Sequence, residues 1–221
     1  RDSNIAEQKV QGRILEVLAG VCDGRSISIS SGTYTLEEVT GVQNIGTTYV
    51  DAKGSVINYK PPSGARQVIY KFTCTIGGDY SGTHPLCHTK LLVDGTEVTN
   101  FRTTQNGHHS MGTTTFVYIF EIGTTDSASS GKFSSWNTNK TIKIQVREYN
   151  STGNSSKLHE TKYWDAATSS QFSIPKLEIT AIGEENLVYN LTNQYSITEG
   201  QVLETLAGVC DGRTVSVSSG I

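Results

Sequence analysis

Aromatic residues beside polar side chains are the features of this sequence best suited to binding a ligand. Tyr80 lies in a Gly-rich stretch, and Trp136 lies in a Ser- and Asn-rich stretch. Tyr163, Trp164 and Asp165 are consecutive. Aromatic rings stack on sugar rings while nearby Asp, Asn and Gln side chains form hydrogen bonds with the hydroxyls. These residues therefore predict a carbohydrate-binding surface. The alternative is that Trp136 and Trp164 cap the ends of a hydrophobic core.

One short stretch combines side chains that could bind a metal ion, because His84, Cys87 and His88 lie within five residues. A structural zinc site needs four ligands in paired short spacings, and this cluster does not supply them. We therefore predict solvated loop histidines, no metal site and no cofactor.

A carboxylate pair for glycoside cleavage could be drawn from Glu148, Glu160 and Asp165. With 21 acidic residues in the chain, some such grouping is expected by chance. The phosphate-binding pattern GxxxxGK(S/T) and the nucleophile pattern GxSxG do not occur. We predict no catalytic residue, and we expect the chain not to be an enzyme.

A segment of 22 residues occurs twice in the chain, 188 residues apart. Residues 11–32 read QGRILEVLAGVCDGRSISISSG and residues 199–220 read EGQVLETLAGVCDGRTVSVSSG, with 15 identical positions. This repeat predicts one full period of a tandem array followed by the start of the next copy. The chain is then expected to be a piece of a longer polypeptide. Tandem copies of a large unit more often build length or multivalency than an active site.

The repeated segment has two parts with different periodicity. In each copy, an apolar stripe at helical spacing predicts a short helix. The stripe consists of Leu15, Leu18 and Val21 in the first copy and of Leu203, Leu206 and Val209 in the second. A turn follows, and strict alternation at residues 26–30 then predicts a strand. Because the segment is too short to hold its own core, we expect the stripe to be buried around the axis of a homotrimer. The alternative is that it packs on its own sandwich, which would leave monomeric beads.

Four cysteines are too few for a disulfide framework in a chain of 221 residues. Cys74 and Cys87 could pair within one domain, and the alternative is that all four cysteines are buried free thiols. Cys22 and Cys210 occupy the same place in the two copies of the repeat, so they are not obvious partners. Four sequons offer surface positions for N-glycosylation. They begin at Asn139, Asn150, Asn154 and Asn190.

Short strands and turn signals fill the chain between the two copies, with no helical pattern. Hairpins are predicted at residues 48–59 and 90–101, which carry Lys-Gly and Asp-Gly turns. Residues 113–121 are apolar on both faces, as in a central strand or a subunit interface. The fold class is therefore all-β, an antiparallel jelly-roll-like sandwich flanked by short helix–strand spacers. The predicted domains are a spacer at residues 1–35, the sandwich at residues 36–184, and a linker with the second spacer at residues 185–221.

Charge and hydropathy exclude two classes of partner. The net charge of −3 gives no electrostatic case for binding nucleic acid or an anionic membrane. No apolar run approaches the ~18 residues that membrane insertion requires.

Several stretches of the sequence occur together in one kind of protein. They are LAGVCDGR, VQNIGTTYVDAKGSVINYKPPSG, DGTEVTN, KIQVREY and LEITAIGE. In this combination the chain resembles repeat-bearing fibre or spike proteins of large algal DNA viruses, and it is similar to tail-fibre-like proteins of marine phages. The resemblance covers nearly the whole chain, with LAGVCDGR its most specific part. It implies a virion-surface, extracellular location, a jelly-roll unit and, in many such proteins, a homotrimer.

Three functions are compatible with these observations. The first is a structural and adhesive module of a virion spike or fibre, which would contact a host-surface polysaccharide or glycoprotein. The second is a carbohydrate-binding module of a large secreted or cell-surface adhesin. The third is a polysaccharide-degrading enzyme domain, which would need clustered carboxylates in a groove.

Overall fold

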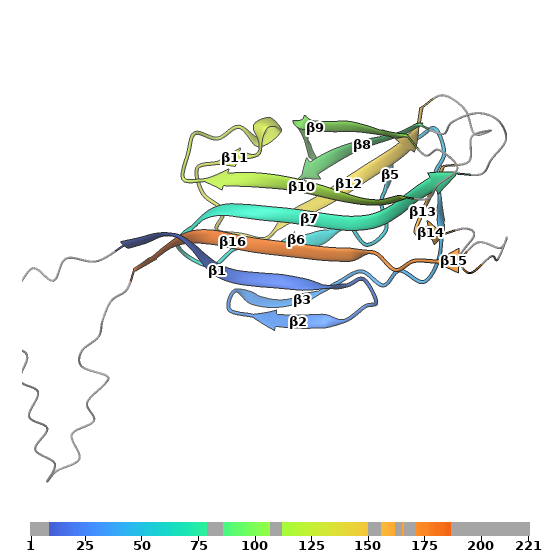
Figure 1. Ribbon diagram of the computed structural model, residues 1–221. Helices are drawn as coiled ribbons and strands as arrows, with labels where there is room; N and C mark the ends of the chain where they lie inside the picture. The colour runs from blue at the N-terminus through green and yellow to red at the C-terminus, as the bar shows by residue number, and fades with distance from the viewer. Residues whose placement is uncertain are drawn as a thin grey trace, which may run out of the picture. The chain divides into compact units, whose positions relative to one another are not determined.

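Two β-sheets packed face to face form the architecture of the protein, shown as a computed structural model in Figure 1. The structure describes residues 9–78, 86–106, 112–149, 156–161, 165 and 171–186. Within these residues the one helical element is a turn of 3-10 helix, η1 (Ala128–Ser130). The prediction of an all-β sandwich is therefore confirmed.

The larger sheet has seven strands. Its main path runs in the order β1, β16, β7, β10 and β11, while β13 pairs with the end of β7 and β4 pairs with β13. Every pair is antiparallel except β10 with β11. Its strands are β1 (Lys9–Val21), β4 (Gln43–Asn44), β7 (Ala65–Gly78), β10 (Gly112–Ile122), β11 (Lys132–Phe133), β13 (Ser156–Leu158) and β16 (Lys176–Asn186).

The smaller sheet has five strands, in the order β5, β12, β8 and β9, with β6 also paired to β12. Its strands are β5 (Val50–Asp51), β6 (Ile57–Tyr59), β8 (Leu86–Val93), β9 (Thr96–Asn106) and β12 (Lys140–Glu148). Two further sheets have two strands each. They are β2 (Ser26–Ile29) with β3 (Gly32–Thr35), and β14 (Glu160–Thr161) with β15 (Gln171–Phe172).

Alternating apolar residues fill the space between the two large sheets. Val68 and Phe72 of β7 are fully buried, and so are Ile142 and Ile144 of β12. Full burial of each such side chain stabilises the fold by about 1.5–3 kcal/mol. The period of two along each strand therefore decides which face packs inward.

The Asp-Gly hairpin lies where the sequence predicts it, between β8 and β9. Asp94 and Gly95 have φ angles of 47° and 80°, as a two-residue turn between twisted strands requires. Residues 113–121 also form the predicted strand, within β10. One face of β10 is buried, whereas Val117 and Ile119 on the other face are 50% and 49% exposed. The outer face of β10 is thus apolar and open to solvent.

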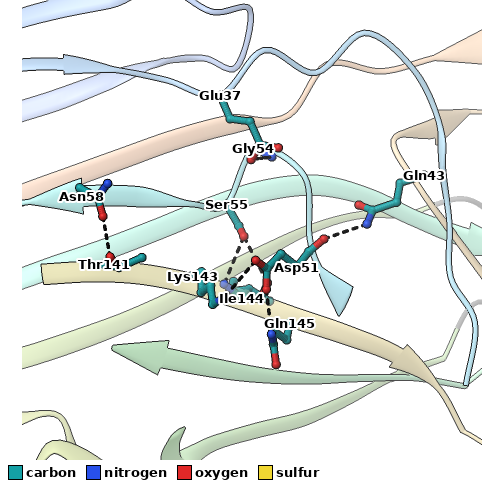
Figure 2. A network of polar contacts seen from close by, with 10 residues as sticks. All are labelled: Glu37, Gln43, Asp51, Gly54, Ser55, Asn58, Thr141, Lys143, Ile144 and Gln145. Atoms are coloured by element: carbon teal, nitrogen blue, oxygen red, sulfur yellow. Dashed lines mark hydrogen bonds and ion pairs between the residues drawn. The ribbon is translucent and has the colours of Figure 1, made fainter. Parts of the chain in front are cut away.

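The predicted hairpin at residues 48–59 is wrong, because β5 and β6 do not pair with each other. Both pair with β12, one after the other along its length. Between them, the Ser55 hydroxyl donates to the Ile144 carbonyl over 3.2 Å and accepts from the Ile144 N–H over 3.1 Å (Figure 2). Where the edge strand is broken, the serine side chain thus supplements the backbone hydrogen bond from the Ala52 N–H to the Ile144 carbonyl, which spans 2.8 Å.

Asp51 fixes β5 on the smaller sheet. Its carboxylate accepts hydrogen bonds from Lys143 over 2.9 Å and from Gln145 over 2.8 Å, and its carbonyl accepts one from Gln43 over 2.8 Å (Figure 2). Burial raises the pKa of Asp51, but the hydrogen bonds from Gln145 and Lys143 lower it further, so the pKa lies below its ordinary value. A two-residue strand is held in place by side chains as much as by its backbone.

The predicted helix of the first repeat copy is wrong, because this stretch is strand β1. Glu16, Leu18 and Cys22 are all buried, whereas Val17 is 45% exposed. The inward positions thus follow the strand period of two. The following strand is confirmed as β2, which pairs with β3.

The first repeat copy is part of the sandwich. Strand β1 pairs with β16, and Leu18 lies in the common core. Leu15 and Val21 are half-buried. Residues 9–35 and the later strands up to residue 186 therefore form one body, and the first copy follows the second alternative, in which the segment packs on its own sandwich. The equivalent stripe residues Leu203, Leu206 and Val209 lie outside the described residues.

The two ends of this body lie side by side. Lys9 of β1 is paired with Asn186 of β16. From there, β7 runs the length of the larger sheet, from Ala65 beside Gly183 to Gly78 beside Ser156. The chain thus enters and leaves the sandwich at one end and turns back at the other (Figure 1).

Candidate binding site

Trp136 belongs to the core. Its side chain is 3% exposed, and its indole N–H donates to the Tyr59 carbonyl over 3.0 Å. The rings of Phe120 and Phe133 meet it edge to face, with centroids 5.5 and 5.1 Å away. The ring is too buried to serve as a stacking platform for a sugar, although the residue touches one of the hollows described below, so the core alternative holds for it.

The other predicted ligand residues are not brought together within the described residues. Tyr80, Tyr163 and Trp164 lie outside them, while Asp165 is exposed and has a left-handed backbone, with φ at 50°. The aromatic surface proposed from the sequence therefore stays a prediction.

A hollow of about 430 Å³ opens near one end of the larger sheet, beside the start of β7, the end of β10 and the neighbouring part of β16. This volume falls within the range of small-molecule sites. Its walls are formed mainly by Arg66, Gln67, Glu121, Ile122, Thr124 and Ile182. The hollow thus combines a guanidinium, an amide, a carboxylate and a hydroxyl with two apolar side chains.

A second hollow of about 260 Å³ shares Arg66 and Ile122 with the first. One wall is the stretch from Lys60 to Ala65, which includes two prolines. The other wall is the stretch from Ser134 to Asn137. The two hollows together form the candidate binding site, with Arg66 between them.

The chemistry of this site suits a polar, acidic ligand. An arginine guanidinium binds a carboxylate or sulfate through two parallel hydrogen bonds. Lys60 adds a second cationic side chain, and the Asn, Gln, Ser and Thr side chains offer donors and acceptors for hydroxyl groups. An acidic sugar presents both kinds of group.

Little in the sequence indicated this site. Arg66 and Gln67 start one strand and Glu121 ends another, and only the antiparallel pairing of Gln67 with Glu121 places them together. The proline pair in the second hollow was a visible turn signal, but a turn does not by itself identify a wall of a site.

The acidic residues considered for catalysis do not line either hollow. Glu148 and Glu160 are buried, and neither they nor Asp165 contributes to the walls of the two hollows. His159 is also buried, and burial lowers its pKa to about 4. Among the described residues, no group of three or more His, Cys, Asp or Glu side chains is placed to hold a metal ion.

The three cysteines among the described residues are free thiols. Cys74 and Cys87 are both buried and unbridged, and Cys22 is as well. Burial raises the pKa of the Cys22 and Cys87 thiols to about 12. Cys210 lies outside the described residues. Of the two alternatives left open by the sequence, the disulfide between Cys74 and Cys87 is therefore absent and the free thiols are present at the described positions.

One of the four sequons falls on a described surface. Asn139 is exposed directly before β12, where an attached glycan would meet solvent. The other three begin outside the described residues, at Asn150, Asn154 and Asn190.

Comparisons with known proteins give no family to which the candidate site could be related. No protein-family model matches the chain, and no curated protein matches it. The described residues contain no helix with the length and apolar character needed to cross a membrane.

Proposed function

We propose that this chain is a structural and adhesive module of a tandem-repeat spike or fibre on a virion surface, which presents a β-sandwich for attachment to a host-surface glycan. The observation that carries the proposal is the position of the first and last residues of the sandwich. Lys9 and Asn186 are paired neighbours at one end of the sandwich. A tandem array of such units is a spine from which each sandwich projects sideways.

This placement leaves the far end of each sandwich free for contact. The strand ends Gly78, Leu86, Asn106 and Gly112 meet there, as the pairing of Leu86 with Asn106 and of Gly112 with Ile76 requires. Segments that connect strands at the end of a sandwich are where binding residues are most often carried. The predicted residue Tyr80 belongs to the segment between β7 and β8.

The strand order supports a jelly roll. With β5 and β6 counted as one broken strand, the long strands of the larger sheet are the first, eighth, third and sixth in the chain, and those of the smaller sheet are the second, seventh, fourth and fifth. This order is the one expected for two Greek keys wound into a double-sheet jelly roll, an architecture used by viral capsid and lectin domains, and it supports the proposed jelly roll. The argument from architecture to function is one of analogy.

A monomeric carbohydrate-binding module of a cell-surface adhesin is the second candidate. The observation in its favour is the burial of Leu18 in the core of its own sandwich, which removes the need for a trimer to cover the repeat stripe. The trimer proposal now rests on the outer face of the larger sheet, where Ile14, Val17, Val117 and Ile119 are exposed.

The molar mass in solution separates the two candidates. Size-exclusion chromatography with light scattering should give the mass of three chains for the fibre module and of one chain at every concentration for the adhesin module. In the trimeric case, Val117→Lys should dissociate the assembly, because it places three charges in the interface. A trimer that persists in this variant would place the interface elsewhere.

The candidate site is a second place for glycan binding, separate from the far end. It lies toward the end of the sandwich where the chain enters and leaves, because Gly183, which lines the first hollow, is paired with Ala65. We expect the chain to bind immobilised carboxylated or sulfated polysaccharide and Arg66→Ala to weaken this binding at least about tenfold, the loss of one charged bidentate contact. Arg102→Ala is the matched control, because Arg102 is exposed on β9 and pairs with Glu97 outside the site. Equal binding by both variants would remove the candidate site from the proposal.

A further inference from the structure

The place that β1 occupies is defined by a long antiparallel edge. Along β16, the pairing runs from Lys9 opposite Asn186 to Val21 opposite Lys176. β1 has β16 as its one neighbour in the larger sheet, so it is the edge strand there. An edge strand with one neighbour can leave its sheet without opening another strand pair of that sheet. Departure of residues 12–31 as a whole opens one further pair, β2 with β3.

Three buried side chains of the first repeat copy fasten it to the rest of the sandwich. Leu18 is fully buried in the core. The Cys22 thiol donates to the Gly54 carbonyl over 3.3 Å. The Glu16 carboxylate accepts a hydrogen bond from the Tyr59 hydroxyl over 2.6 Å. These contacts join residues 16–22 to parts of the chain that follow the repeat.

The second repeat copy carries the same side chains at every one of these positions. Glu204, Leu206 and Cys210 correspond to the three fastening residues, at the constant offset of 188. Ser30 and Ser31, which also donate to the Glu16 carboxylate, correspond to Ser218 and Ser219. The buried contacts of the first copy can therefore all be made by the second.

Four of the positions at which the two copies differ can be compared directly. Ile14 and Val17 face solvent and are replaced by Val202 and Thr205. The half-buried isoleucines of β2 are replaced by valine, which has the same branching and a smaller volume. None of these four exchanges falls on Glu16, Leu18 or Cys22, the residues that fasten the segment to the sandwich.

The glycines that shape the segment are kept as well. A Cβ atom at Gly20 would approach the Leu36 side chain to 2.9 Å, and Gly24 has a φ angle of 81°. Their counterparts Gly208 and Gly212 are identical. The second copy thus has glycine at the two positions where the first copy requires it, including the close approach to Leu36.

The connection from β16 to the second copy has sufficient length. With the same register, Ile197 would lie opposite Asn186, and residues 187–196 would form the hairpin connection. Paired residues of an antiparallel ladder are about 5 Å apart, whereas this connection can span about 30 Å when extended. Residues 32–219 then make up one complete 188-residue period. This period begins with β3 and ends just after the counterpart of β2 in the second copy.

From these observations we infer that residues 200–219 of the same chain can replace residues 12–31 beside β16, so that one sandwich accepts either copy of this β1–β2 segment. In a tandem array, each sandwich can then take this segment from its own repeat or from the following one. The exchange converts independent domains into domains linked by a shared strand pair. It requires no ligand and does not depend on the glycan-binding proposal.

The test uses the full chain with Leu18→Asp, with the matched variant Leu206→Asp, and with both. An Asp at the fully buried Leu18 position should expel the β1–β2 segment that carries it from the sandwich. Native-state labelling with a thiol reagent, read by peptide mass spectrometry, reports which copy is buried, because Cys22 and Cys210 have the same local sequence. Cys74 and Cys87 are buried in β7 and β8 and report whether the sandwich is folded.

We expect Leu206→Asp to leave Cys22 protected. Leu18→Asp should reverse the pattern: Cys22 becomes labelled, Cys210 becomes protected, and Cys74 and Cys87 stay protected in a single-chain species by light scattering. The double variant should expose Cys74 to the reagent. Continued protection of Cys22 in Leu18→Asp would overturn the inference, and so would labelling of Cys74 to the level of the double variant. Protection of Cys210 in a dimer alone would overturn the same-chain placement.

Discussion

Replacing Tyr59 with Phe tests whether the buried carboxylate of Glu16 holds the β1–β2 segment on the sandwich. The Tyr59 hydroxyl donates to Glu16 over 2.6 Å, and the hydroxyls of Ser30 and Ser31 donate to the same carboxylate over 2.6 Å each. Burial raises the pKa of Glu16, but the hydrogen bonds from Ser30, Ser31 and Tyr59 together lower it below its ordinary value. The ionised carboxylate is therefore the form that the fold stabilises.

The expected loss follows from the charge on the acceptor. A hydrogen bond to a charged group contributes about 1.5–3 kcal/mol, and Tyr59→Phe removes one such bond while keeping the buried ring. For a domain of this size, the loss corresponds to a decrease in Tm of about 3–12 °C. Because the folded-state pKa of Glu16 is lowered, the stabilisation is present above its unfolded pKa and is lost as the pH falls through the folded pKa. The deficit of Tyr59→Phe should therefore be full at neutral pH and shrink in acid.

Tyr70→Phe is the control for this measurement. Tyr70 is also fully buried, but its hydroxyl donates over 2.7 Å to the neutral carbonyl of Ser55. We expect a loss of about 0.5–1.5 kcal/mol that does not change in acid. Urea unfolding of both variants and the parent chain, at neutral pH and in acid, gives the free energies of unfolding. Equal losses in the two variants, or a Tyr59→Phe deficit that is the same in acid, would refute the argument from the carboxylate.

Three further predictions concern other parts of the sandwich. Gly131→Ala should lower the free energy of unfolding by more than 1 kcal/mol, because Gly131 has a φ angle of 66° and a Cβ atom there would overlap the Tyr118 ring; thermal unfolding measures it, and an unchanged Tm would contradict it. Burial lowers the folded-state pKa of His159 to about 4 from an ordinary 6.5, so the free energy of unfolding should fall with decreasing pH across this window, by up to about 1.4 kcal/mol per pH unit. His159→Asn, which tolerates the left-handed φ of 64°, should flatten that slope in urea titrations, and an unaltered slope would assign it to another group. The three described cysteines should resist a thiol reagent in the native state and react after unfolding, and a reducing agent should leave Tm unchanged.

Strand patterns outside the repeat could be predicted from the sequence because their two faces differ clearly. The first half of the repeat could not, for a physical reason, although its second half was correctly predicted as a strand. Along β1 the inward positions include Glu16 and Gly20, a charged residue and one without a side chain. Because neither residue is apolar, a search for apolar residues misses these two inward positions. The remaining residues Leu15, Leu18 and Val21 have the spacing of a helix, which led to the wrong prediction. Pairing with β16 decided the outcome, since tertiary contacts override local propensity.

Neither the residue types nor the positions of the candidate site could be predicted from the sequence, which indicated aromatic side chains and not Arg66. Trp136 stands in a polar stretch, yet its indole N–H finds a carbonyl in the core and its ring packs between phenylalanines. Arg66 and Glu121 are distant in the sequence, and only the register of β7 with β10 places their strand ends together. Such a site depends on sheet register, which a single sequence specifies weakly at strand ends.

The pairing of Lys9 with Asn186 also determines how an array of these units would respond to tension. A force that pulls on both ends of one unit acts on the first rung of the β1–β16 ladder. The hydrogen bonds of an antiparallel pair are perpendicular to the strands, so this load opens them one after another instead of all at once. Each unit would yield at low force by peeling away β1, while the interior strands of both sheets stay closed. A fibre built in this way lengthens stepwise under load and recovers when β1 returns to the edge.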